Sequence, residues 1–135
     1  MKNCVFCQIA KKEINSLIVG ENELSLAFLD IHPLSPGHTL VIPKEHKTRF
    51  SQLEKKEILL LMNLVREISV KIESNLKADG FTLGINDGKA AGQAIDHFHF
   101  HIIPRYFNDG GHSIHSVVNF PPQEPLEEIY KKIKL

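Results

Sequence analysis

Three histidines alternate with apolar residues in the segment HFHFHII, which contains His97, His99 and His101. In an extended strand, neighbouring side chains point to opposite faces and each residue advances the chain by roughly 3.3 Å, so the three imidazoles share one face. The phenylalanines and isoleucine between them form the other face, which suits a hydrophobic core. Imidazole titrates close to neutral pH and can act as a nucleophile, a proton carrier or a metal ligand. The segment therefore predicts a reactive surface that a core holds rigid.

The loop before this strand, NDGKAAGQA at residues 86–94, is rich in glycine and other small residues. Gly88 and Gly92 allow the backbone to approach a ligand closely and to point several N–H groups at an anion such as phosphate. A neutral imidazole nitrogen can attack phosphorus and form a covalent intermediate. Loop and strand together favour phosphate chemistry on histidine. A plain hairpin connection and a metal site on the H-x-H pattern are the alternatives.

A second motif lies at the start of the chain, where Cys4 and Cys7 have the C-x₂-C spacing of a zinc half-site. A thioredoxin-like redox pair needs a strand before it, and three preceding residues leave no room for one. Two further ligands must come from elsewhere, and composition cannot choose among the eight histidines. The pair thus predicts a zinc site, with two small buried thiols as the alternative.

Hydrophobic periodicity predicts several short strands and one long helix. The clearest helix starts at a capping-box pattern of Ser51 and Glu54 and continues with leucine and isoleucine at helical spacing to about Leu76. The other expected elements are a short helix or turn at 5–12, strands at 16–20, 24–29, 38–43 and 81–85, the histidine strand, and a last helix from Pro125. This order lacks regular βαβ alternation, so it predicts an α+β domain whose mainly antiparallel sheet is covered by helices on one face.

Composition limits the partners that this chain can have. The 135 residues are 42% hydrophobic, which suits one domain, and 16 basic residues balance 16 acidic ones. A general nucleic-acid binder needs a cationic excess, so nucleic acid is not expected as a partner. No apolar stretch is long enough for a signal peptide or a membrane span, which predicts a cytoplasmic protein without membrane contact.

Three stretches, CVFCQIAKKEI, LAFLDIHPLSPGHTLVIPKEH and NDGKAAGQAIDHFHFHIIPR, resemble the histidine triad (HIT) superfamily, and in particular its Hint-like, zinc-containing bacterial and archaeal branch. They cover most of residues 4–105 in the expected order. The resemblance implies a single HIT domain over residues 1–135, with a five-stranded antiparallel sheet, one long helix and one or two shorter ones. It also implies a two-fold dimer. The apolar run ILLLMNLVREI at 58–68 offers surface for that contact.

The resemblance also implies a reaction, in which His99 attacks the α-phosphorus of a nucleoside 5′-phosphoramidate or acyl-adenylate. Water then releases AMP or a similar purine nucleotide. His101 matches the histidine that assists the leaving group, and His38 matches an outlying histidine that supports the site. Asp30 and Ile31 match the ribose and base positions. The phosphate and leaving-group side corresponds to Asn86, Gly92, Gln93 and Ala94, of which Ala94 departs from the hydroxyl residue found in many Hint-like proteins.

For the metal, the resemblance implies a closed Cys₂His₂ zinc site made of Cys4, Cys7, His46 and His97. His97 is also the first histidine of the triad, so it counts among the catalytic set as well. Three other functions are alternatives for the same motifs: a dinucleoside polyphosphate hydrolase, a nucleotide-binding scaffold whose activity is incidental, and a plain metal-binding protein. The absence of tryptophan means that the chain lacks the Trp-containing tail of animal Hint proteins.

Overall fold

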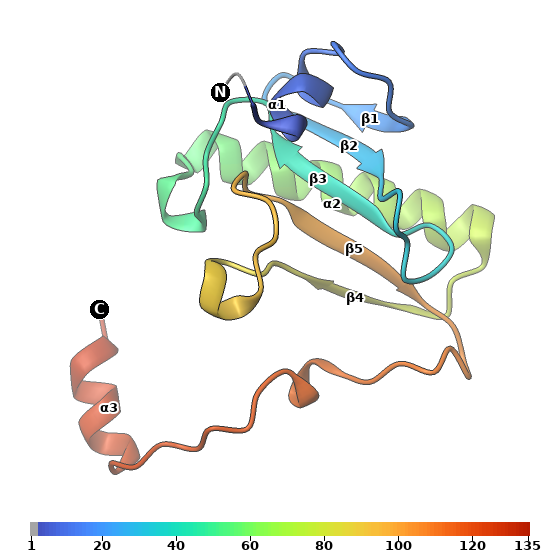
Figure 1. Cartoon of the computed structure of the whole chain (residues 1–135). Coiled ribbons are helices and arrows are strands. Elements are labelled where there is room, and N and C mark those ends of the chain that lie inside the picture. Colours follow the sequence, from blue (N-terminus) through green and yellow to red (C-terminus); the bar gives the residue numbers. More distant parts are fainter. Residues whose placement is uncertain (1–2) are drawn as a thin grey trace.

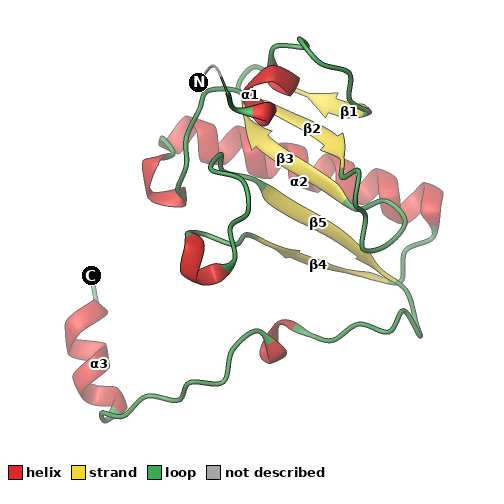
Figure 2. Cartoon of the chain, viewed as in Figure 1, coloured by secondary structure: helices red, strands yellow, loops and turns green. Residues whose placement is uncertain are grey.

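The computed structural model describes residues 3–135, which contain three α-helices and one five-stranded antiparallel sheet, with α1 and α2 next to the sheet and α3 away from it (Figures 1 and 2). The strand order across the sheet is β1-β2-β3-β5-β4. The strands are β1 Ile18–Glu21, β2 Ser25–Leu29, β3 Thr39–Pro43, β4 Gly80–Gly84 and β5 Phe100–Arg105, and the helices are α1 Val5–Ala10, α2 Lys55–Leu76 and α3 Leu126–Ile133. The α+β prediction with a five-stranded antiparallel sheet is confirmed.

The long helix α2 covers one face of the sheet and receives the apolar side of the histidine segment. Leu61, Leu64, Val65, Ile68 and Ile72 of α2 form a buried cluster with Ala27, Val41, Phe98 and Ile102. Because Phe98 and Ile102 point toward α2, the alternating histidines point to the opposite face, as the pattern predicted. The core therefore fixes which way the triad faces.

The opposite face of the sheet is also partly covered, which differs from the one-sided arrangement that the sequence predicted. Phe6 and Ile9 of α1 pack on Leu26, Phe28, Leu40 and Ile42 of the central strands. Burial on both faces explains why β2 and β3 read as nearly continuous apolar runs. The short helix α1 thus brings the N-terminal cysteines to the face that carries the histidines.

Two element boundaries differ from the sequence prediction by more than two residues. A short 3₁₀ turn at Phe50–Gln52 comes before α2, and the cap of α2 is Glu54, whose backbone N–H donates to the Glu57 carboxylate at 2.9 Å. The predicted capping box of Ser51 and Glu54 is wrong because the Gln52 side chain accepts the N–H groups of Thr48 and Arg49 and closes its own turn first.

The second boundary is that of β5, which begins at Phe100 and not at His97. The Phe98 N–H donates to the Lys47 carbonyl at 2.6 Å, outside the sheet ladder. Side chains still alternate through this segment, so the faces are kept although regular pairing starts later.

After β5 the chain runs as an extended arm, and α3 lies at its end, away from the sheet (Figure 1). α3 has Pro125 as its N-cap residue, acidic residues in its first turn and basic ones in its last, as predicted. None of the described helices is long and apolar enough to cross a bilayer. The predicted cytoplasmic location stays a prediction.

Candidate active site

His99 lies at the centre of the site, and the backbone fixes the orientation of its ring. Its Nδ1 lies 2.8 Å from the His97 carbonyl oxygen, which can only accept, so Nδ1 donates and carries the ring proton. The ring packs edge-on against Phe6 with 5.3 Å between centroids and is 8% exposed. Nε2 is left with its lone pair.

That lone pair is accessible. Within residues 3–135, Nε2 of His99 has no hydrogen-bond partner, and Ser25 Oγ is the one fully buried side-chain nitrogen or oxygen that lacks a partner. Nε2 therefore reaches solvent. A ring that is held by a carbonyl on one side and open on the other is arranged to act as a nucleophile.

His101 and His38 form a hydrogen-bonded chain beside His99. The Leu34 amide donates to His38 Nδ1 at 3.0 Å, so the proton of a neutral His38 is on Nε2. His38 Nε2 lies 3.0 Å from His101 Nδ1 and donates to it, which leaves the proton of His101 on its own Nε2. The His101 ring is 5.0 Å from the His99 ring between centroids. A donor on His101 thus lies next to the His99 ring, whose Nε2 has a lone pair.

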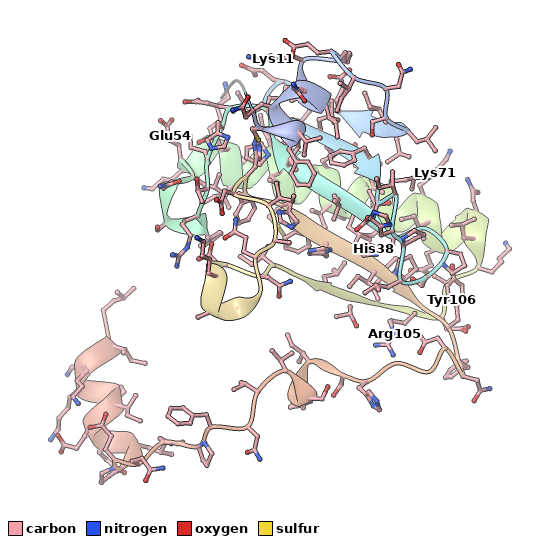
Figure 3. All side chains as sticks on the ribbon, in the orientation of Figure 1. Lys11, His38, Glu54, Lys71, Arg105 and Tyr106 are labelled. Carbon is pink, nitrogen blue, oxygen red and sulfur yellow. The ribbon has the colours of Figure 1, made fainter. Side chains whose placement is uncertain are left out.

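The strand register brings His38 and His101 together. Leu40 of β3 pairs with His101 of β5, and His38 is two residues before Leu40 on the same face, diagonal to His101. Figure 3 shows His38 at the start of β3, beside β5. Burial lowers the pKa of His101 to about 4 and also lowers the pKa of His38, against the opposing charge of Asp30. At neutral pH both rings are uncharged, as the hydrogen-bonded chain requires.

The residues predicted for ribose and base lie at the edge of this site. One Asp30 carboxylate oxygen accepts the His32 N–H at 2.9 Å, and the other lies 3.6 Å from His38 Nε2. Ile31 is 83% exposed, so it has apolar surface free for a ligand.

The loop 86–94 contains the predicted phosphate-side residues, but they differ in what their side chains do. Gln93 is buried, and its amide accepts the Gly88 N–H at 2.7 Å and donates to the carbonyls of Thr48 and Ile95. Its side chain thus shapes the loop, and Gly92 adopts a positive φ of 87° as the loop turns. The backbone N–H groups of Gly88, Gly92 and Gln93 also donate within the loop, so these internal bonds hold its shape.

The remaining two predicted loop residues lie on different sides of the site. Asn86 lines a cavity together with His101. Ala94 is exposed and lies on the other side, in a hollow that it shares with Cys4 and His46. Asn86 thus lies near His101, and Ala94 lies near the end of the triad that contains His97.

The predicted metal ligands form a second cluster at the far end of the triad. One nitrogen or sulfur from each of Cys4, Cys7, His46 and His97 lies within 4.8 Å of every other. Cys4 Sγ and Cys7 Sγ lie 3.3 Å and 3.5 Å from His97 Nδ1, and Cys7 Sγ lies 3.3 Å from His46 Nδ1. In a tetrahedral zinc site with the usual bond lengths, sulfur and nitrogen ligands are about 3.5 Å apart. The donor set and its spacing therefore fit zinc.

The hydrogen bond that His97 makes through its other ring nitrogen supports the same interpretation. His97 is fully buried, and its Nε2 donates to the Pro43 carbonyl at 2.8 Å, which directs the Nδ1 lone pair toward the two thiols. Burial lowers the pKa of His97 to about 4, so the ring is neutral and able to ligate a metal. Burial also raises the pKa of the Cys7 thiol, and a bound cation would act in the opposite direction.

Three contributors to the site were not predicted from the sequence. The Leu34 amide and the Thr48 carbonyl act through the backbone, so residue type gives no signal for them. Phe6, inside the CVFC motif, supports the His99 ring, and its place beside a ligand-like cysteine was the one available hint.

Comparison with known proteins agrees with this geometry. The HIT domain model matches residues 11–108, and the chain therefore belongs to the histidine triad family. It is 41% identical over 131 residues to an uncharacterized HIT-like protein of Mycoplasma genitalium, covering 97% of this chain and 92% of that one. It is 38% identical over 137 residues to adenosine 5′-monophosphoramidase of Schizosaccharomyces pombe, covering 98% and 99%.

Solved structures give the same result. A HIT family member from Bacillus subtilis is similar with a TM-score of 0.85 and 36% identity, over 97% of this chain and 94% of that one. A Zn-bound histidine triad family protein from Mycobacterium smegmatis is similar with a TM-score of 0.76 and 36% identity, over 81% and 79%. Fold and family, as predicted from the sequence, are confirmed.

Proposed function

We propose that this protein is a nucleotide hydrolase or nucleotidyl transferase that works through a covalent nucleotidyl-His99 intermediate. The observation that carries the proposal is the position of the proton on each of two neighbouring rings. His99 is held at Nδ1 by a carbonyl and offers a lone pair at Nε2, while His101 offers a proton at Nε2. A nucleophile beside a hydrogen-bond donor is the pair of groups that displacement at phosphorus requires.

The reaction divides into two displacements. The His99 Nε2 lone pair forms a bond to the α-phosphorus, and the bond from phosphorus to the leaving group breaks, with its electron pair going to the leaving group. The His97 carbonyl stabilises the positive charge that develops on the ring through Nδ1–H. Water then forms a bond to phosphorus, the bond to His99 breaks, and the electron pair returns to Nε2. Over both steps one water is consumed: its oxygen and one of its protons stay on the nucleotide, and its second proton accounts for the one that the leaving group takes up.

The nucleotide in this proposal is a purine nucleotide such as AMP or GMP. Asp30 would accept hydrogen bonds from the ribose, and the exposed Ile31 would contact the base. The loop that contains Gly92 and Gln93 would lie beside the phosphate, which the Nε2 proton of His101 would help to hold, with Asn86 on the leaving-group side. Ala94 has no hydroxyl to add a further hydrogen bond.

For the substrate class we propose nucleoside 5′-phosphoramidates or acyl-adenylates. The Schizosaccharomyces pombe relative is named an adenosine 5′-monophosphoramidase, which favours this class over dinucleoside polyphosphates. We further propose that zinc bound by Cys4, Cys7, His46 and His97 has a structural role. Since all four positions would be taken by protein, the ion would tie α1 to the segment that presents His99 and would not activate water.

We also propose a single domain over residues 1–135 and a two-fold dimer. Four residues of the apolar run at 58–68, Leu61, Leu64, Val65 and Ile68, pack on the sheet of their own chain, but Leu59 and Met62 are 62% and 44% exposed. β4 lies at one edge of the sheet, where its outer hydrogen-bonding groups can pair with a second copy. Measuring the mass in solution by sedimentation tests this part, and a monomer at micromolar concentration would contradict it.

The main test uses the variant His99→Ala and adenosine 5′-phosphoramidate. Loss of the nucleophile should reduce AMP release at least roughly a thousandfold. AMP binding, measured by calorimetry, should change only a few-fold because the loop and Asp30 remain. Turnover that persists would remove His99 from its proposed role. If the wild type binds AMP and releases none from any phosphoramidate or acyl-adenylate, the protein is a nucleotide-binding scaffold instead.

A further inference from the structure

We propose that a cavity between β4, β5 and the C-terminal arm binds an apolar leaving group, such as an acyl chain or the hydrocarbon part of an amine. This inference rests on the proposed function and names the substrate class within it. The cavity has a volume of about 240 Å³, and His101 and Asn86 form one end of it. That is smaller than the roughly 300–1,000 Å³ of sites that hold a whole ligand, so it suits one part of a substrate.

A missing side chain in β4 creates this space next to the triad. Gly84 pairs directly with His101 and Thr82 with Ile103, and directly paired residues of antiparallel strands share a face. A Cβ built on Gly84 would meet no atom within 4 Å, although the residue faces a catalytic histidine. The strand thus leaves room where most residues would fill it.

The arm closes the other side of the cavity. Ile114 and Val117, from the 3₁₀ turn that begins at Ile114, line the space and remain 65% and 73% exposed. The start of the arm is fixed to the sheet, because Arg105 donates to the His112 carbonyl at 2.8 Å and to Thr82 Oγ1 at 3.0 Å. Figure 3 shows Arg105 at the point where the arm leaves β5.

The chemistry of the lining selects the leaving group. Apart from His101, whose ring is neutral at pH 7, no lining residue has a titratable side chain, and the rest of the wall is largely aliphatic. The aliphatic members are Leu34, Leu83, Ile85, Ile103, Ile114 and Val117. A sulfate or polyphosphate leaving group would find no cation here. An apolar chain would instead exchange water contact for contact with these side chains.

The test is a series of adenosine 5′-phosphoramidates of primary n-alkylamines, from methyl to hexyl. These amines have similar basicity, so chain length changes burial and not leaving-group chemistry. In the wild type, kcat/KM should rise roughly three- to fourfold for each methylene until the cavity is full. Diadenosine tetraphosphate, whose leaving group is anionic, should be turned over at least about tenfold less efficiently than the hexyl compound.

Two glycines of the same strand give a matched pair of variants. Gly84→Val fills the cavity and should reduce the ratio of hexyl to methyl kcat/KM to about one. Gly80→Val is on the same strand and face, opposite Arg105, and also has no atom within 4 Å of an added Cβ, so it should keep the wild-type ratio. If Gly84→Val does not fold, as judged by thermal melting, Val117→Ser on the arm serves instead and should lower the slope with chain length.

The outcomes separate this inference from the proposed function. Turnover of every alkyl compound with no dependence on chain length overturns the leaving-group site and leaves the hydrolase intact. A dependence that Gly84→Val keeps also overturns it. Absence of turnover for every compound, with AMP still bound, overturns the proposed function itself.

Discussion

Two groups of potential metal-ligating side chains on the same face of the sheet each contain two histidines but differ in their chemistry. One group is Cys4, Cys7, His46 and His97, and the other is Asp30, His38 and His101; in each group the ligand atoms lie within 4.8 Å of one another. In the first group, His97 donates its Nε2 proton to the Pro43 carbonyl and turns a lone pair toward the thiols. In the second group, His38 accepts the Leu34 amide at Nδ1, so its inward Nε2 carries a proton and cannot ligate a metal without losing it.

This difference shows that the backbone partner, and not burial, decides which nitrogen of each imidazole carries the proton. Burial is the largest cause of the lowered pKa in both His97 and His101, and in each the pKa falls to about 4. A carbonyl behind the ring leaves a lone pair on the opposite nitrogen, as for His97 and His99, and a lone pair is what a metal ligand or a nucleophile needs. An amide behind the ring makes a proton donor, as for His38.

Removal of one ligand from the first group should have the largest effect. We expect the wild type to hold roughly one zinc per chain; Cys7→Ser should lose most of it, and its free energy of unfolding should fall by about 3–5 kcal/mol. His38→Ala should keep its zinc, because the second group is not a metal site. Metal analysis of protein purified without chelator, combined with thermal melting, measures both. Zinc that is retained in Cys7→Ser and lost in His38→Ala would reverse the assignment of the two groups.

A pH effect of somewhat smaller size is expected in the second group. The pKa of His101 is about 4 in the folded protein and roughly 6.5 when unfolded, so the unfolded state takes up the proton first. Stability should therefore fall as pH drops from about 6.5 to 4 and level off below, by at most roughly 3 kcal/mol for this group. Denaturant unfolding of wild type and His101→Gln across this window isolates the contribution. Equal pH slopes in the two proteins would contradict the buried, neutral state of His101.

Loss of the hydrogen bond between His38 and His101 should reduce kcat by a smaller factor. His38→Ala removes the donor that fixes the His101 proton on Nε2, so kcat should fall about 10- to 100-fold with little change in KM. Nitrogen-15 NMR of the histidine rings is the independent readout. It should find the wild-type proton on Nδ1 of His99 and on Nε2 of both His38 and His101. A proton on His101 Nδ1 would contradict the claim that His38 donates to His101.

The smallest effect is expected at Asp30. Asp30→Asn keeps an oxygen for the His32 N–H and removes the charge beside His38. Loss of ribose contacts should raise KM for adenosine 5′-phosphoramidate about 3- to 10-fold while kcat stays within about threefold. Steady-state kinetics decide this. A large fall in kcat with unchanged KM would mean that Asp30 acts on the histidine chain and not on the ribose.

The two groups also differ in how far the sequence predicted them. Period-2 alternation placed His97, His99 and His101 on one face because Phe98 and Ile102 had to enter the core. The ligand set and the role of His38 came from the family resemblance, since neither depends on local spacing. The Leu34 amide was not predictable, because a backbone donor exists at nearly every position. The cap of α2 was placed wrongly because Gln52 bonds within the preceding turn, a competition that sequence patterns do not reveal.

The central claim is that Nε2 of His99 becomes bonded to phosphorus during turnover. Rapid acid-free quenching of the wild type with adenosine 5′-phosphoramidate, followed by peptide mass spectrometry, tests it most directly. We expect an adenylyl adduct on His99 that forms at least as fast as AMP is released and that His99→Ala lacks. An adduct on His101, or steady release of AMP with no protein-bound nucleotide at any time, would contradict the claim.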